Sequence, residues 1–236
     1  MVVSPRQSPR ISANQLAQYM VSSDTARLGI IRKARDPQTP VIIRYRDARA
    51  PICAFLSDQQ RKLNPLTAAE DMLQQRSDDP SESPFRKDDA KSSIEVIRAI
   101  QRMGNSLSQY EFHLPPSNQD KLYICGVEIS IRADLVVYGS SRGVKQIGAA
   151  VLRMTQDDAD TDAARDKRRD MGCVVATLTK LHVEKNLSGE RLPVNKLCMS
   201  IDVQHGELFV APNANTRRMN DIESVCRVIS EMWDKA

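Results

Sequence analysis

The chain has 236 residues, of which 41% are hydrophobic and 27% are charged, and its formal net charge is +4. A chain of this length can build one large domain or two small ones around a real hydrophobic core. No stretch approaches the roughly 18 apolar residues that a membrane-spanning helix needs, and the first ten residues lack the apolar centre of a signal peptide. We therefore expect a cytoplasmic protein with no membrane contact.

The cysteines and the motif content exclude several other classes. Five cysteines are scattered along the chain, odd in number and never spaced as C-x-x-C, so neither a disulfide framework nor a zinc site is indicated. The sequence has no G-x-S-x-G, no Walker phosphate loop and no G-x-G-x-x-G, which argues against the corresponding hydrolases and nucleotide enzymes. An aromatic content of 4% argues against a base-stacking surface.

Positive charge is concentrated in the N-terminal quarter. Residues 1–62 hold 11 Lys and Arg against 4 Asp and Glu, a balance of +7, whereas residues 63–236 hold 23 against 26. Such a region suits a phosphate backbone because binding releases condensed counterions, although solvated helix faces carry similar charges. We expect a nucleic acid, with DNA the first candidate, to contact Arg32, Lys33, Arg35, Arg44, Arg46 and Arg49.

Three helices are predicted in this N-terminal region. Ser12 and Gln15 have the spacing of a capping box and begin the first. The second extends from Ser23-Asp24 to Arg35, and its basic end suits the helix dipole. The third covers Val41 to Leu56 and carries the last three arginines of the proposed contact set.

The following segment is predicted to be a loop or linker. The run from Gln74 to Asp89 is rich in Ser, Pro and charge and contains one aromatic residue. We therefore divide the chain into an N-terminal helical basic region (1–62), a loop or linker (63–92) and a core (93–236).

The core is predicted to be a mixed sheet flanked by helices, an α/β fold of the α+β type. Val127–Val137 alternates apolar and polar residues, Val144–Met154 is apolar on both faces after a glycine-rich turn, and Leu197–Val203 opens a second hairpin. These three strands should be neighbours, with helices over residues 93–103, 160–187 and 217–234. In the second of these helices we expect Lys167, Arg168 and Arg169 to face solvent.

This order of elements resembles the centre of the PD-(D/E)XK nuclease superfamily, in its RecB-like branch. Gly126 to Asp134 resembles the strand that carries the first acid, and Gln146 to Met154 occupies the place of the (D/E)-x-K strand. Ile11 to Leu16 also resembles the helix that opens many of these nucleases. The positions of the second acid and the lysine hold Ala149 and Val151 instead, so the motif is degenerate.

The resemblance implies a restriction-endonuclease-like fold, and it assigns Asp134 as the catalytic and metal-binding acid of a Mg²⁺ site. Glu95 is a second catalytic candidate, because a glutamate on the first core helix often joins the metal site in such families; it is otherwise an exposed acid of a first helical turn. Glu128 shares the predicted face of Asp134 but lies roughly 20 Å along the strand, too far for one ion. Asp202 could also approach, and Lys145 is the nearest substitute lysine.

Two functions of different class therefore remain open. The favoured one is a nuclease-like protein without catalysis or cofactor, which binds nucleic acid or serves as a subunit of a DNA-processing or phage-defence complex. The alternative is an active Mg²⁺-dependent nuclease whose missing residue comes from another strand or helix. A protein partner or a homo-oligomer is compatible with either.

The two functions give Asp134 different roles. In a nuclease it binds metal, whereas in a non-catalytic relative we expect a structural ion pair with Arg132, two residues away on the same face. His182, near the end of the 160–187 helix, is expected to be a helix-face or satisfied core histidine rather than a metal ligand, and no second histidine follows at i+4.

Overall fold

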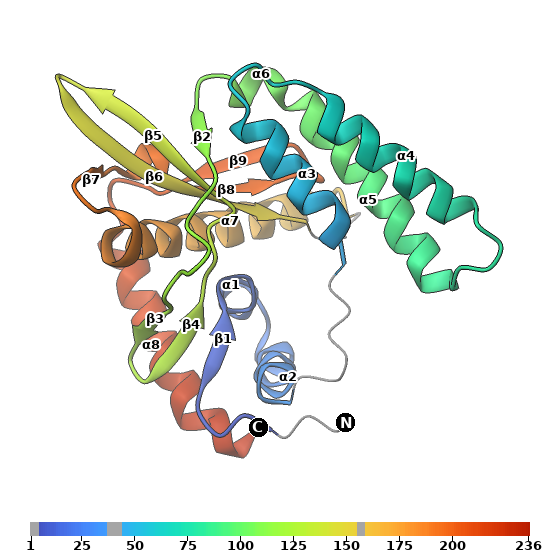
Figure 1. Cartoon of the computed structure of the whole chain (residues 1–236). Helices are drawn as coiled ribbons and strands as arrows, with labels where there is room; N and C mark the ends of the chain where they lie inside the picture. Colours follow the sequence, from blue (N-terminus) through green and yellow to red (C-terminus); the bar gives the residue numbers. More distant parts are fainter. Residues whose placement is uncertain (1–4, 37–43, 155–158) are drawn as a thin grey trace.

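The computed structural model describes residues 5–36, 44–154 and 159–236 of the chain. It contains a six-stranded mixed sheet in the order β2-β5-β6-β8-β9, with β7 beside β6, and a three-stranded sheet in the order β1-β4-β3 (Figure 1). The strands are β1 (Arg10–Ser12), β2 (Glu111–His113), β3 (Leu122–Ile124), β4 (Val127–Ser130), β5 (Leu135–Ser141), β6 (Val144–Arg153), β7 (Leu192–Pro193), β8 (Met199–Asp202) and β9 (Glu207–Val210). The helices are α1 (Ala13–Met20), α2 (Asp24–Arg35), α3 (Arg46–Ser57), α4 (Asn64–Asp78), α5 (Pro84–Arg102), α6 (Gly104–Leu107), α7 (Asp162–His182) and α8 (Thr216–Met232).

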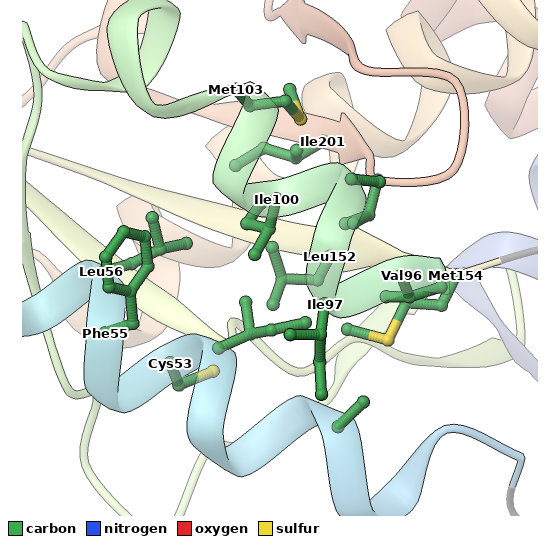
Figure 2. Packing of buried hydrophobic residues seen from close by; sticks show 14 of the residues in the cluster. Cys53, Phe55, Leu56, Val96, Ile97, Ile100, Met103, Leu152, Met154 and Ile201 are labelled. Atoms are coloured by element: carbon green, nitrogen blue, oxygen red, sulfur yellow. The ribbon is translucent and has the colours of Figure 1, made fainter. Parts of the chain in front are cut away.

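Strand β6 lies at the centre of the large sheet, antiparallel to β5 and parallel to β8. Its residues are buried on both faces from Gln146 onward, as expected for a covered central strand. Leu152 lies in one hydrophobic cluster with residues of α3 and α5 (Figure 2). Ala150 and residues of α4 belong to the same cluster, whereas Val151 belongs to a second cluster with residues of α7. The predicted mixed sheet flanked by helices is confirmed, and the three predicted core strands contribute its neighbours β5, β6 and β8.

The turn between β5 and β6 explains the register of this hairpin. Arg142 and Gly143 connect the strands, and both have positive φ, at 51° and 79°. Two positive φ values in a two-residue connection are those of a type I′ turn, whose twist matches that of the flanking strands. The pairing that follows places Leu135 opposite Ala150.

The prediction of one strand over Val127–Val137 is wrong. Burial does alternate as expected, but β4 ends at Ser130 and belongs to the small sheet, whereas β5 begins at Leu135 in the large one. Between them the side chain of Gln119 takes both backbone groups of Ala133: the Ala133 N–H donates to Gln119 Oε1 at 2.8 Å, and Gln119 Nε2 donates to the Ala133 carbonyl at 3.0 Å. Side-chain hydrogen bonds therefore replace the strand ladder at this position, and apolar periodicity cannot reveal that change.

The predicted loop over residues 63–92 is also wrong, because α4 and α5 occupy most of it. Pro65 lies in the first turn of α4, where a missing N–H costs nothing, and Leu66, Ala69 and Leu73 are buried at helical spacing. Ser83 caps α5 by accepting from the Arg86 N–H. The Ser- and Pro-rich run thus covers the end of α4, a short turn over residues 79–83 and the start of α5.

The N-terminal helices are as predicted for α1 and α2, and the third begins later than expected. Ser12 and Gln15 form the predicted capping box. The predicted start of the third helix, residues 41–43, lies outside the described residues, and Arg44 precedes α3 in a turn rather than lying on it. In the part of the chain described, no helix is both long and apolar enough to cross a membrane.

Two hydrogen bonds of Trp233 link the N-terminal segment to the C-terminal end of the chain. Trp233 Nε1 donates to the Arg6 carbonyl at 3.0 Å, and Arg35 Nη1 donates to the Trp233 carbonyl at 3.1 Å. Residues of α1, α2, β4 and α8 share one hydrophobic cluster, which is separate from the cluster of α3, α4 and α5. The segment before residue 36 is therefore packed with the C-terminal helix.

His182 is fully buried and connects α7 to Gln119. Its Nε2 lies 3.0 Å from Gln119 Oε1, and its Nδ1 lies 3.0 Å from Asn186 Nδ2. An amide nitrogen can only donate, so the imidazole is neutral, with its proton on Nε2. Burial lowers the pKa of His182 from its usual 6.5 to about 4. The histidine is a satisfied core residue, as expected.

Gly148 should tolerate no side chain, because a Cβ there would lie 2.0 Å from the backbone carbonyl oxygen of Leu197. We expect Gly148→Ala to lower the free energy of unfolding by about 2–3 kcal/mol through overpacking. Gly29 is the matched control: it lies in α2 with no atom within 4 Å of an added Cβ, so Gly29→Ala should stabilise by about 0.5–1 kcal/mol. Urea unfolding of the two variants would contradict this packing if both shifts had the same sign.

The neutral His182 should make stability depend on pH. Its folded-state pKa is depressed, so its contribution is complete above about pH 6.5 and falls as pH drops toward 4, where the unfolded chain binds a proton that the folded protein excludes. The loss should reach about 3 kcal/mol at most near pH 4. His182→Gln should flatten the stability profile between pH 7 and 4 in urea titrations. An unchanged slope would contradict a buried neutral imidazole.

Candidate functional site

Asp134, the acid singled out by the sequence, lies immediately before β5 with a side chain that is 8% exposed. Both carboxylate oxygens are engaged within the protein. Oδ1 accepts from Arg49 Nη1 at 2.6 Å, and Oδ2 accepts from the backbone N–H of Leu152 at 2.7 Å. The carboxylate therefore joins helix α3 to the end of strand β6.

The sheet register explains why these partners are needed. The last paired residues of β5 and β6 are Leu135 and Ala150, so a continuing ladder would place Ala133 opposite Leu152. Ala133 instead bonds to Gln119, which leaves the Leu152 peptide without its strand partner. Asp134 accepts the Leu152 N–H, and Arg49 Nη2 donates to the Leu152 carbonyl at 3.3 Å. The side chains of Asp134 and Arg49 thus supply the acceptor and the donor that a neighbouring strand would supply. Backbone groups that are buried without a hydrogen-bond partner would lower the stability of the fold.

The predicted ion pair between Asp134 and Arg132 is wrong. Arg132 is exposed, and the cation at the Asp134 carboxylate is Arg49, 85 positions away in sequence. A spacing of two residues favours contact only if the strand is regular, and here the chain leaves the strand between residues 131 and 134. No local pattern in the sequence could have identified Arg49 as the partner.

The positions that correspond to the acid and lysine of the resembling family are apolar and buried. Ala149 is 0% exposed and Val151 is 6% exposed, and each belongs to a hydrophobic cluster. Lys145, the substitute lysine considered from sequence, is exposed near the hairpin turn and pairs in register with Ser140. Lys145 and Leu152 lie near opposite ends of β6.

The other candidate acids are dispersed over different elements. Glu95 is exposed on α5, and Glu128 is in the small sheet, where it pairs with Arg10 at 3.0 Å and Lys121 at 2.8 Å. Asp202 is fully buried at the end of β8. Within residues 5–36, 44–154 and 159–236, no group of three or more His, Cys, Asp or Glu side chains is arranged to hold a metal ion.

The predicted nucleic-acid contacts fall into two groups. Arg35, Arg44 and Arg49 have partners within the protein: Arg35 with the Trp233 carbonyl, Arg44 with Asp88 at 3.1 Å and with the Phe85 ring, and Arg49 with Asp134. The other three, Arg32, Lys33 and Arg46, are exposed at the end of α2 and the start of α3. We call these three residues the basic surface.

A second polar cluster, which the sequence analysis largely missed, lies between the large sheet and α7. Arg153 and Asp202 are register partners at the ends of the parallel strands β6 and β8, 1% and 0% exposed, with Nη1 and Oδ2 3.6 Å apart. Arg153 Nη1 also donates to the Arg168 carbonyl, and burial lowers the pKa of Arg153. Arg168 was predicted to face solvent but is 4% exposed, so that prediction is wrong.

Packing explains the position of Arg168. Helix α7 approaches β9 closely enough that a Cβ on Gly172 would lie 2.2 Å from the Phe209 ring, and this approach turns the Arg168 side of the helix inward. The guanidinium then donates to the Ala159 carbonyl at 2.7 Å. The sequence does contain one signal for this cluster. Arg153 is an arginine that directly follows the apolar run from Ile147 to Leu152.

We expect Asp134 to stabilise the fold. Asp134→Ala removes the acceptor of the buried Leu152 N–H and should lower the free energy of unfolding by about 2–3 kcal/mol. Arg49→Met should cost less, about 1–2 kcal/mol, because the Arg49 side chain is 39% exposed and solvent screens the ion pair. A double-mutant cycle in urea should give a coupling of about 1 kcal/mol, with exposed Arg46→Met as a control near zero. An Asp134→Ala variant as stable as the wild type would contradict the structural role.

Comparison with protein-family models, with curated proteins and with solved structures finds no match to the chain. The resemblance to PD-(D/E)XK nucleases therefore stays a prediction that rests on residues 126–134 and 146–154. The structural roles of Asp134 and Arg49 follow from their own contacts.

Proposed function

We propose that this protein is a non-catalytic relative of the PD-(D/E)XK nucleases that binds nucleic acid, as a DNA-binding subunit of a DNA-processing or phage-defence complex. The observation that carries the proposal is the engaged carboxylate of Asp134. Its two oxygens accept from Arg49 at 2.6 Å and from the Leu152 N–H at 2.7 Å. The carboxylate holds the fold together at the place where a nuclease would hold Mg²⁺.

The energetics of the alternative support this choice. Mg²⁺ demands near-octahedral oxygen ligands, so a metal at Asp134 would have to compete with the Arg49 guanidinium at Oδ1 or with the Leu152 N–H at Oδ2. A second carboxylate would also be needed, and the corresponding position is the buried Ala149. The buried Val151 cannot orient or activate water as a lysine would.

The basic surface supports a polyanionic partner. Arg32, Lys33 and Arg46 project their charges into solvent, and none of the described residues forms an ion pair with them within 4 Å. Charges of this kind can approach backbone phosphates without first breaking an internal bond, whereas Arg49 cannot. The partner is therefore expected to be recognised through its phosphates, with little base discrimination.

The proposal is tested by the salt dependence of DNA binding. A triple variant with Arg32, Lys33 and Arg46 changed to Gln should lower the slope of log affinity against log salt, by up to about 0.9 for each duplex phosphate that the variant no longer neutralises. The matched control changes Arg142, Lys185 and Lys196 to Gln, three exposed cations elsewhere on the molecule. It carries the same charge difference and should keep the wild-type slope.

Fluorescence anisotropy with a labelled duplex, from 50 to 300 mM NaCl, measures both slopes. Equal slopes for the two triple variants would show that net charge alone attracts DNA and would remove the basic surface from the proposal. A wild-type protein with no salt-dependent binding to duplex or single-stranded nucleic acid would overturn the proposed function.

A further inference from the structure

A pocket of about 470 Å³ lies between the end of α3 and the segment that leads from α6 into β2. Among the described residues that line it, the apolar and aromatic ones include Leu56, Tyr110 and Phe112, and the charged ones are Asp58, Arg61 and Glu111. Its volume is within the range of pockets that bind small organic molecules. No role assigned above uses this pocket.

Arg61, at this pocket, has a backbone conformation that residues with a side chain rarely adopt. Its φ is 50°, in the left-handed region that favours glycine. The chain turns directly after α3, where the Arg61 N–H donates to the Asp58 carbonyl at 3.0 Å. Residues that contacts hold in such a conformation cluster at ligand sites, so the contacts of the Arg61 side chain indicate what this position serves.

The guanidinium of Arg61 is held by two carbonyl groups and two aromatic rings. Nη2 donates to the carbonyls of Leu107 and Tyr110, at 3.3 Å each. The centroids of the Phe55 and Phe112 rings lie 5.8 and 5.4 Å from the guanidinium carbon, within the range of cation–π contacts. These contacts fix the position of the group, and its Nε and Nη1 form no hydrogen bond with the described residues.

The positive charge of Arg61 is only partly compensated. Burial lowers the pKa of the guanidinium from its ordinary 12.5, and the Asp58 carboxylate acts in the opposite direction. No acid among the described residues forms an ion pair with Arg61 within 4.0 Å. The oxygens of Asp58 accept from the backbone N–H groups of Gln60 at 3.2 Å and Lys62 at 2.9 Å. A partly buried cation without a paired anion favours an anionic ligand.

We propose that this pocket binds an aromatic monocarboxylate, with the carboxylate on Arg61 and the ring of the ligand against Tyr110 and Phe112. The rings of Tyr110 and Phe112 lie with centroids 5.9 Å apart and supply the surface for an aromatic group. Asp58 and Glu111 line the same pocket, so they repel a ligand with two negative charges, such as a phosphomonoester, more strongly than a monoanion. The inference does not depend on the nucleic-acid proposal, because it uses no residue of the basic surface.

Titration of the full chain with phenylacetate, followed by NMR at neutral pH and low ionic strength, tests the site. Binding should be saturable, and phenylacetamide, which has nearly the same shape without the charge, should bind about ten-fold more weakly or worse. Arg61→Met removes the charge and should weaken phenylacetate by about the same factor. Arg142→Met is the matched control, because Arg142 is an exposed arginine with φ at 51° in the turn between β5 and β6. It should change the affinity less than about two-fold.

A second variant decides the case in which circular dichroism shows that Arg61→Met does not fold. Glu111 lies on the edge strand β2 with its side chain 59% exposed, so Glu111→Gln should keep the fold. Removal of this negative charge should tighten phenylacetate about two-fold or more and leave phenylacetamide unchanged. In that case an unchanged phenylacetate affinity in Glu111→Gln overturns the proposal. Absence of saturable phenylacetate binding, equal binding of phenylacetate and phenylacetamide, or equal weakening by Arg61→Met and Arg142→Met overturns it as well.

Discussion

The peptide group of Leu152 needs hydrogen-bond partners that no strand supplies, and the surroundings of Asp134 follow from that need. The Asp134 N–H still donates to the Ala150 carbonyl at 2.9 Å, and at Ala133 the backbone groups bond to Gln119 instead of to β6. Asp134 and Arg49 then complete the hydrogen bonding of Leu152 with an acceptor and a donor. An ion pair at the protein surface is worth little, but one that also satisfies a buried peptide contributes more because its removal leaves polar groups unpaired.

This arrangement also joins the layers of the protein. Arg49 comes from α3, whose apolar residues pack with those of α5 on one side of the large sheet (Figure 2). Leu152 belongs to the same apolar cluster, and its neighbours on β6 alternate toward α7 on the other side. A polar contact at the sheet end and an apolar contact over its face therefore hold α3 in one position. The functional consequence is that Asp134 serves packing, and the exposed cations of the N-terminal region are left for other contacts.

Structural features could be predicted from the sequence where they depend on residues close together in the chain, and not where they depend on contacts between distant residues. The capping box at Ser12, the buried strand β6 and the helix α8 were predicted because each rests on residues within a few positions of one another. The loop over residues 63–92 was a false prediction, since two capped helices with polar outer faces have the composition of a linker. The partner of Asp134 was beyond prediction, because Arg49 is distant in sequence and the intervening Gln119 decides where the strand ends.

The same reasoning applies to the buried charges. Arg153 and Asp202 become partners only through the parallel register of β6 and β8, which a single sequence does not specify. Arg168 is buried because Gly172 lets α7 approach Phe209, a contact between residues far apart in the chain. Solvent exposure of a charged helix residue is the safer expectation from sequence, and here the close helix-to-sheet contact overrides it.

The central claim is that Asp134 stabilises the fold and does not bind a catalytic metal ion. Incubation of supercoiled plasmid and single-stranded DNA with the wild-type protein and Asp134→Ala, in Mg²⁺ and in Mn²⁺, tests it most directly. The account predicts no metal-dependent cleavage by either protein, at any protein concentration that still leaves DNA in excess. Metal-dependent cleavage by the wild type that disappears in a folded Asp134→Ala variant would contradict it and establish the protein as a nuclease.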